Sequence, residues 1–435
     1  MGVNGWLTVN SWQSGVMGRI RRWAPRMAGI VVTVACLVGA GQLLWPQPGL
    51  DEQPGSTARQ LAFVRGALDE GSDTAAQELF PEGYVFSNVL YGLAWVQAAH
   101  ADSGLRDDAL RESRWALARL ESDEGRAVFN PRLQPTYGVF WAGWTNWLRG
   151  AILSLDSSDT AAVQQFSTRS AEIAQAFSAA DTPFLQAYQG QAWPVDSTVA
   201  MASLRLHDTL FGAQYTPVID RWLEQAKTRL DPATGLLPHQ VSPTDGSMTT
   251  GARATSQTVI LRFLPEIDPA FARNQYTRYR NQFLAHPGGF GPAVREYPKG
   301  VDGSGDVDSG PLVAGISLSA TVVAVGAARV NGDRALAAAI GSEGELIGLP
   351  IDLPWSKRYA FGLLPIGDAF VVWSSTARLL TAAPITVEHD VRWWWRLPWL
   401  GVLGLIAIAP WAWTSARLVR GRAERHATGL TATPR

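Results

Sequence analysis

The 435-residue chain is predicted to be an all-α protein in which two transmembrane helices flank a toroid of six helical hairpins. Residues 28–45 and 395–416 are apolar runs, each long enough to cross a bilayer as a helix. Between them, six nearly uncharged segments alternate with amphipathic ones at steps of 53 to 58 residues. No stretch between them alternates polar and apolar residues as a half-buried strand does.

The composition excludes several classes of protein. Charged residues make up 17% of the chain and hydrophobic residues 46%, which is too apolar for a disordered protein. A net charge of -1 provides no general attraction to nucleic acid. Cys36 is the only cysteine, so no disulfide can form within the chain.

Positive charges predict the orientation of the two membrane helices. Four arginines in the N-terminal tail, residues 1–27, precede the first apolar run, and Arg417, Arg420, Arg422 and Arg425 follow the second in the tail 417–435. Because positive residues stay in the cytoplasm, both termini are expected there and residues 46–391 outside, at the cell membrane. A signal peptide cleaved near Ala40 and a lipoprotein attached at Cys36 are the alternatives for the first run.

The predicted inner helices open with small, polar or proline residues and continue with few charges. They start near Gly83, Thr136, Trp193, Gly251, Asp308 and Pro365. The predicted outer helices carry a single apolar stripe and cover residues 57–68, 107–120, 160–178, 217–230, 269–284 and 333–340. Buried helices inside and amphipathic helices outside give a closed ring of hairpins.

This alternation resembles the (α/α)6 toroid of the six-hairpin glycosidase superfamily. The resemblance covers nearly all of residues 46–391 and is one of architecture, so it implies carbohydrate chemistry only by analogy. Terpenoid cyclases and the linalool dehydratase-isomerase family share the toroid. One cyclase class carries Asp-x-Asp-Asp, whereas here Asp306-Val307-Asp308 is followed by Ser309, which disfavours a terpenoid-type enzyme.

The candidate catalytic residues are acids at the starts of the inner helices. In a toroid these N-termini gather at one end, where their dipoles favour carboxylates. The candidates are Asp196, Asp306, Asp308 and Asp368, joined by Glu82, His239 and Arg253 as substrate-binding residues. Helix capping is the simpler interpretation of any single Asp.

Asp196 and Asp368 are the first candidate pair, because they stand on helices that face each other across the ring. With neighbouring axes ~9 Å apart, opposite axes are ~18 Å apart. Side chains reaching inward would leave a gap near the ~6.5–9.5 Å of inverting glycosidases. One Asp would be the acid and the other the base, and Asp306 or Asp308 are alternative partners.

Aromatic residues near the same helix starts could stack on sugar rings or pack the core. The candidates for substrate binding are Tyr84, Tyr137, Trp141, Trp193, Phe290, Tyr297 and Trp355. No metal or other cofactor is expected. Asp302, Ser304, Asp306 and Asp308 alternate as in a calcium loop, but Val313 occupies the position where such loops carry Glu, and the six His lack zinc spacing.

The sequence therefore predicts a membrane-anchored enzyme of the cell envelope, a glycoside hydrolase that uses two carboxylates on a carbohydrate or other small-molecule substrate. A lyase or epimerase on the same fold, which would depend more on Tyr, His or Arg, is one alternative. A non-catalytic platform that binds a glycan or a protein is the other. The sequence does not identify a protein partner.

Overall fold

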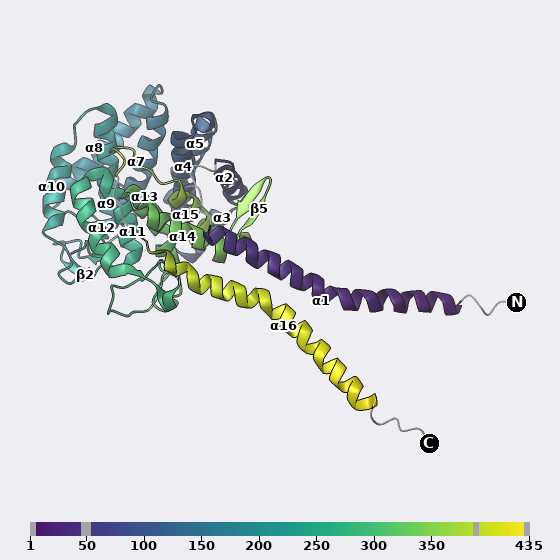
Figure 1. Ribbon diagram of the computed structural model, residues 1–435. Coiled ribbons are helices and arrows are strands. Elements are labelled where there is room, and N and C mark those ends of the chain that lie inside the picture. The colour runs from purple at the N-terminus through teal and green to yellow at the C-terminus, as the bar shows by residue number, and fades with distance from the viewer. Residues whose placement is uncertain (1–5, 45–53, 386–390, 430–435) are drawn as a thin grey trace, which may run out of the picture. The chain divides into compact units, whose positions relative to one another are not determined.

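The computed structural model describes residues 6–44, 54–385 and 391–429 (Figure 1). About 66% of the chain is helical and the strands are few and small. The chain divides into two compact units. We call Met1–Pro46, Gly288–Phe290 and Arg392–Arg435 the two-helix unit, and Gln47–Pro287 with Gly291–Val391 the helical domain.

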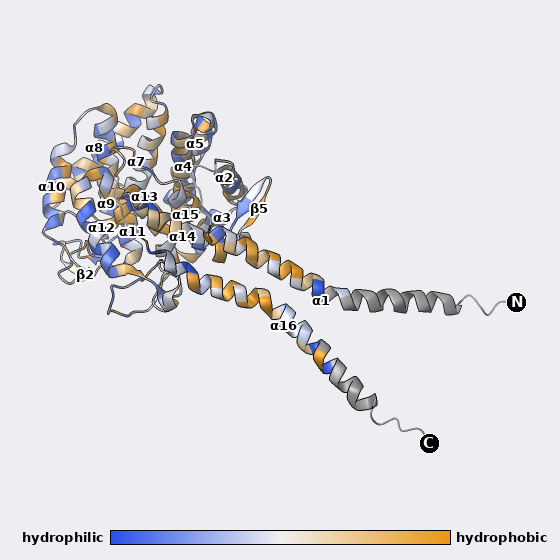
Figure 2. Ribbon diagram, in the orientation of Figure 1, coloured by the Kyte–Doolittle hydropathy of each residue, from blue (hydrophilic) through white to orange (hydrophobic). Residues whose placement is uncertain are grey.

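The two-helix unit consists of α1 (Trp6–Leu44), the short η5 (Trp393–Trp395) and α16 (Arg396–Gly429). Residues Arg26–Leu44 and Trp393–Arg417 are long and apolar enough to cross a membrane, as predicted. Figure 2 shows mainly hydrophobic residues along these parts of both helices. The helices pack together, and the Trp411 indole N–H donates to the Thr33 hydroxyl at 2.9 Å.

Six helices of the helical domain are buried on most sides. They are α4 (Gly83–Ala101), α7 (Gly138–Leu155), α9 (Pro194–Phe211), α11 (Ala254–Ile267), α13 (Leu318–Val330) and α15 (Pro365–Ser375). Each packs against the next in this order, and α15 packs against α4. All six fall where the sequence predicts an apolar helix.

The remaining long helices bury one side only, as their amphipathic sequences predict. They are α2 (Pro54–Asp69), α5 (Arg106–Leu120), α8 (Thr160–Ala179), α10 (Thr216–Lys227), α12 (Pro269–Phe283) and α14 (Arg334–Ile347). Shorter elements join them: α3 (Ser72–Leu79), η2 (Ser103–Leu105) and α6 (Asp123–Arg126). Each outer helix alternates along the chain with an inner one.

Aromatic side chains from several inner helices meet in the core. The Trp144 ring on α7 lies 5.1 Å from Phe263 on α11 and 5.9 Å from Trp373 on α15, measured between ring centroids. Phe86 on α4 contacts Trp144 at 5.5 Å. Large rings therefore fill the space between helices that are not neighbours in the packing order. A polar site must lie toward the helix ends.

Small hairpins occupy three of the connections, where the sequence predicts no strand. They pair β1 (Gln240–Val241) with β2 (Met248–Thr250), β3 (Leu284–Ala285) with β4 (Ala293–Val294), and β5 (Ile351–Leu353) with β6 (Ser356–Arg358). Strands of two or three residues are too short to produce a visible alternation. The η3 turn (Pro287–Gly289) and the η4 turn (Ala360–Gly362) complete the elements.

Candidate active site

Three carboxylates from distant parts of the chain come together in the helical domain. Glu82 occupies the N-cap position of α4 without a capping hydrogen bond from its side chain, Asp196 lies in the first turn of α9, and Asp308 lies in the loop before α13. The charges of Glu82 and Asp308 both act on Asp196. We call these three residues the acidic cluster. It joins the N-terminal ends of two inner helices to the loop that leads into a third.

Asp196 is buried without a hydrogen-bonding partner. Its residue surface is 6% exposed, and within residues 54–385 no hydrogen bond to its carboxylate is found. The N-cap of α9 is Trp193, so Asp196 does not cap this helix. Burial, followed by the charges of Glu82 and Asp308, raises the pKa of Asp196 well above its usual value. Burial therefore favours the protonated form of this carboxyl group, which is the form that can donate a proton.

Asp308 is held in place through its backbone. Its N–H donates to the Asp306 carboxylate at 3.2 Å, and its C=O accepts from the Ser319 hydroxyl on α13 at 2.6 Å. The residue is exposed to solvent on one side, and protein atoms surround its carboxyl group closely enough to remove part of its hydration. That burial, together with the charges of Asp306 and Glu82, raises the pKa of Asp308 to about 6.

Tyr188 orients Glu82. The Tyr188 hydroxyl donates to Glu82 Oε1 at 2.5 Å. The ring stacks on Phe129 at 5.6 Å and meets Trp193 edge-on at 6.1 Å. Burial and the charge of Glu82 raise the pKa of Tyr188, so the phenol keeps its proton and acts as a donor.

A second group of charges, centred on Arg253, supports the loop that carries Asp308. Arg253 Nε donates to Glu296 Oε1 at 2.8 Å, and its Nη1 donates to the Asp306 carboxylate. Burial raises the pKa of Asp306, but the hydrogen bonds from Arg253 and Ser309 outweigh it and lower the pKa to about 2. Asp306 therefore stays ionised and accepts from the backbone of Asp308 and Ser309.

His239 and Tyr297 lie beside this arginine. The His239 ring is buried, with its Nδ1 2.6 Å from the Ser256 hydroxyl. Burial, followed by the charge of Arg253, lowers the pKa of His239 to about 4. The Arg253 guanidinium lies over the Tyr297 ring, 5.3 Å from its centroid. The structure thus brings His239, Arg253, Tyr297, Asp306 and Asp308 together.

Asp368 has different neighbours from Asp196. It lies in the first turn of α15, where its carboxylate accepts from Gln60 at 3.2 Å and from the Tyr359 N–H at 3.0 Å. Burial raises the pKa of Asp368 to about 6, and the nearby cations that lower it are Arg358 and Lys357. The acids that act on Asp196 are Glu82 and Asp308. The geometry therefore favours these two as its partners over Asp368.

Several of the predicted aromatic residues are packed against other side chains. Tyr84 and Trp141 are 4% and 3% exposed, and the Trp141 indole donates to the Leu120 carbonyl. Tyr137 meets Trp141 edge-on at 5.1 Å. Phe290 belongs to the two-helix unit and contacts Trp399. Trp193 is half-buried and meets Tyr188, the residue that donates to Glu82.

No metal site is evident in the described part of the chain, where no group of three or more His, Cys, Asp or Glu is arranged to hold an ion. In the sequence that alternates as a calcium loop does, Asp302 pairs with Arg295 at 3.0 Å and Asp306 with Arg253. These carboxylates are already neutralised by arginine.

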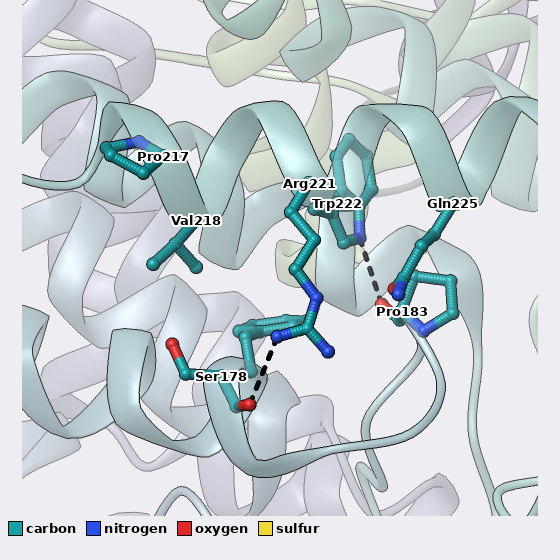
Figure 3. Close-up of a pocket in the computed structure, with 8 residues that line it drawn as sticks. Ser178, Pro183, Pro217, Val218, Arg221, Trp222 and Gln225 are labelled. Atoms are coloured by element: carbon teal, nitrogen blue, oxygen red, sulfur yellow. Dashed lines mark hydrogen bonds between the residues drawn. The ribbon is translucent and has the colours of Figure 1, made fainter.

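A pocket of about 230 Å³ lies elsewhere, between α8 and α10 (Figure 3). Phe177, Pro183, Val218 and Trp222 give it a largely apolar lining. Arg221 donates to the Ser178 carbonyl at 3.2 Å, and the Trp222 indole donates to the Pro183 carbonyl at 2.9 Å. Its lining contains no carboxylate, so it is not a candidate for acid–base chemistry.

Two residues of the site, Tyr188 and Glu296, have no signal in the sequence. Tyr188 is 106 residues from Glu82, and Glu296 is 43 residues from Arg253. Both lie in connections between helices, where no periodic pattern marks them. No protein-family model matches the chain, and a search of curated proteins finds no match.

Proposed function

We propose that the helical domain is an (α/α)6 toroid. The order of packing supports this, because α4, α7, α9, α11, α13 and α15 contact one another in sequence and the last contacts the first. Six outer helices alternate with them along the chain. The two apolar helices would anchor the toroid outside the cytoplasm, with both termini inside, as the arginine distribution favours.

We further propose that the domain is a carboxylate-dependent hydrolase of envelope glycans. The single observation behind this proposal is Asp196, a buried carboxyl group without a hydrogen-bonding partner beside two other acids. Such an arrangement costs folding stability and suits acid–base chemistry. Asp196 would be the general acid, and Glu82, oriented by Tyr188, the base or nucleophile. The charge of Asp308 would help to keep the pKa of Asp196 raised.

Neighbouring aromatic rings favour a sugar as the substrate. Trp193 and Tyr188 are each partly exposed and stand beside the acidic cluster. Flat ring faces next to paired carboxylates are suited to stacking on a pyranose while its glycosidic oxygen is protonated. A deprotonated tyrosine is one base that a lyase or epimerase on this fold would use. The raised pKa of Tyr188 argues against that role.

The test is turnover by the full chain in lipid nanodiscs, screened against cell-envelope polysaccharides. For a substrate that is found, Asp196→Asn and Glu82→Gln are each expected to lower kcat at least ~100-fold, the usual contribution of a general acid or base. Asp108→Asn, at an exposed surface pair with Arg111, is the matched control and is expected to leave kcat unchanged.

Two results would overturn the proposal. Full turnover by Asp196→Asn would remove this residue from the chemistry. Tight glycan binding without turnover, equal in wild type and Asp196→Asn, would favour the non-catalytic platform. Loss of activity in Asp368→Asn, with Glu82→Gln unaffected, would instead restore the pair of acids on α9 and α15.

A further inference from the structure

A set of apolar side chains is exposed on one part of the helical domain. They lie at the end of α14, on the β5–β6 hairpin and in the loop before α15. We call them the hairpin surface: Ile347, Leu349, Trp355, Phe361, Leu363 and Leu364. Trp355 is 70% exposed and Leu363 is 81% exposed. Scattered single apolar residues are ordinary on a protein surface, but six within eighteen residues are not.

Backbone contacts hold the surface together. The Ala360 N–H donates to the Gly348 carbonyl at 2.8 Å, which brings the two ends of the segment side by side. Between them β5 and β6 pair, with Leu353 opposite Ser356, so Trp355 stands in the tight turn of the hairpin. The exposed residues therefore belong to one ordered structure.

The backbone is strained where it displays these side chains. Leu349, Ala360 and Phe361 have φ angles of 48°, 45° and 60°, in the left-handed region that L-residues rarely adopt. Strain of this kind persists where the surrounding structure holds it, and it clusters at sites of function. Here it keeps Leu349 and Phe361 more than half exposed instead of buried.

Two charged groups of the hairpin form ion pairs, and a third lies against an aromatic ring. Asp352 accepts from Arg59 at 2.7 Å, and Lys357 Nζ lies 2.6 Å from Glu345. The Arg358 guanidinium lies 5.7 Å from the centroid of the Phe63 ring. Paired charges lower the cost of moving this surface out of water.

The hairpin is tied to the part of the chain that follows the first apolar helix. Ser56 and Arg59 both lie at the start of α2. Ser56 accepts from Lys357, and Arg59 donates to Asp352. Ser56 is twelve residues beyond Leu44, the last residue of α1. Twelve residues reach at most ~40 Å. If α1 crosses a membrane, chain length alone keeps Ser56, and the Lys357 ammonium bonded to it, within that distance of the end of α1.

We propose that the hairpin surface inserts into the interfacial region of the membrane in which the two apolar helices are anchored. Trp, Phe and Leu are the side chains that partition there, with the Trp ring at the headgroup level. The partner is the lipid surface itself. The proposal is independent of the proposed hydrolase, because it rests on exposure, strain and chain length and not on the acidic cluster.

The test uses spin labels on the full chain in nanodiscs. In a Cys36→Ser background, Trp355→Cys and Leu363→Cys are labelled with a nitroxide. Met248→Cys, apolar and exposed on β2 among polar neighbours, is the matched control. Labels at 355 and 363 are expected to be more accessible to oxygen than to a polar nickel chelate, and the label at 248 the reverse. Each variant is first checked for an unchanged Tm in detergent.

Two results of this experiment would overturn the proposal. Labels at 355 and 363 that are as accessible to the nickel chelate as the label at 248 would show that the surface stays in water. Dipolar broadening between labels, in nanodiscs that hold two copies of the chain, would show that a second copy covers it.

Discussion

Two buried carboxylates at the ends of inner helices differ in their hydrogen-bonding and charged neighbours. Glu266, near the end of α11, accepts from the Leu380 and Thr381 N–H groups at 3.0 and 2.9 Å, and from the Thr381 hydroxyl at 2.8 Å. Arg262 lies 3.5 Å away as its ion partner. Asp196, at the start of α9, has two other acids as its charged neighbours.

This difference distinguishes a carboxylate that is buried to hold the fold together from one that is buried for a functional role. Glu266 joins α11 to Leu380 and Thr381, and these donors offset part of the water it has lost, although burial still raises the pKa of Glu266. Asp196 lacks this compensation, so its position weakens the fold. A protein tolerates such a cost where the group has another task. The two residues should therefore respond to mutation with opposite signs of stability change.

The largest expected effect is loss of stability in Glu266→Ala. The substitution leaves the fully buried Arg262 without its counter-ion and frees the N–H groups of residues 380 and 381. Breaking a buried pair in this way costs about 3–5 kcal/mol. Chemical denaturation in detergent measures it. Asp69→Ala, which removes an exposed partner of Arg65, is the control and should cost less than ~1 kcal/mol.

Asp196→Asn is expected to stabilise the protein by about 1–3 kcal/mol at pH 8, because folding at this pH must either bury the Asp196 charge or bind a proton to neutralise it, and Asn avoids both. The folded pKa of Asp196 is raised, so wild-type stability is fully present below the unfolded pKa near ~3.8 and falls as the pH rises. The gain of the variant should therefore vanish at pH 4. Equal Tm values for both proteins at pH 8 would contradict the contrast with Glu266.

Arg253→Lys tests whether the arginine positions Asp308 through Asp306. A lysine keeps the charge but cannot reach Glu296 and Asp306 together as the guanidinium does. We expect kcat on a found substrate to fall about tenfold, equivalent to ~1.4 kcal/mol of barrier, with KM little changed. Arg221→Lys, at the pocket between α8 and α10, is the control. An unchanged kcat in Arg253→Lys would show that the Asp308 loop holds without this link.

The smallest effect concerns the titration of Asp308. A carboxyl ¹³C NMR titration should give a pKa of about 6 for Asp308 in the wild type. Glu82→Gln should lower this pKa by up to about one pH unit, because it removes one of the two like charges beside Asp308. Asp352→Asn, at the β5–β6 hairpin, should leave it unchanged. A pKa near 4 in the wild type would mean that the acids of the cluster do not interact.

Much of the fold could be predicted because hydrophobic patterns are local. The twelve long helices of the domain and the two apolar helices each carry their signal within one stretch of residues. Boundaries were less accurate. A helix expected from about Asp308 begins at Leu318, because residues 308–317 form a loop with left-handed backbone at Gly310, Ala314 and Gly315.

The sequence alone locates Glu82 and Asp196 at helix starts from the pattern of apolar runs, and it locates Asp308 in the connection that leads into the next apolar helix. Which of these acids meet was decided by the tertiary structure. Asp196 has Glu82 and Asp308 beside it, whereas Asp368 bonds Gln60, and Tyr188 reaches Glu82 across 106 residues. Electrostatic and hydrogen-bonding neighbours depend on distance in space, and no local pattern of residue types records that distance.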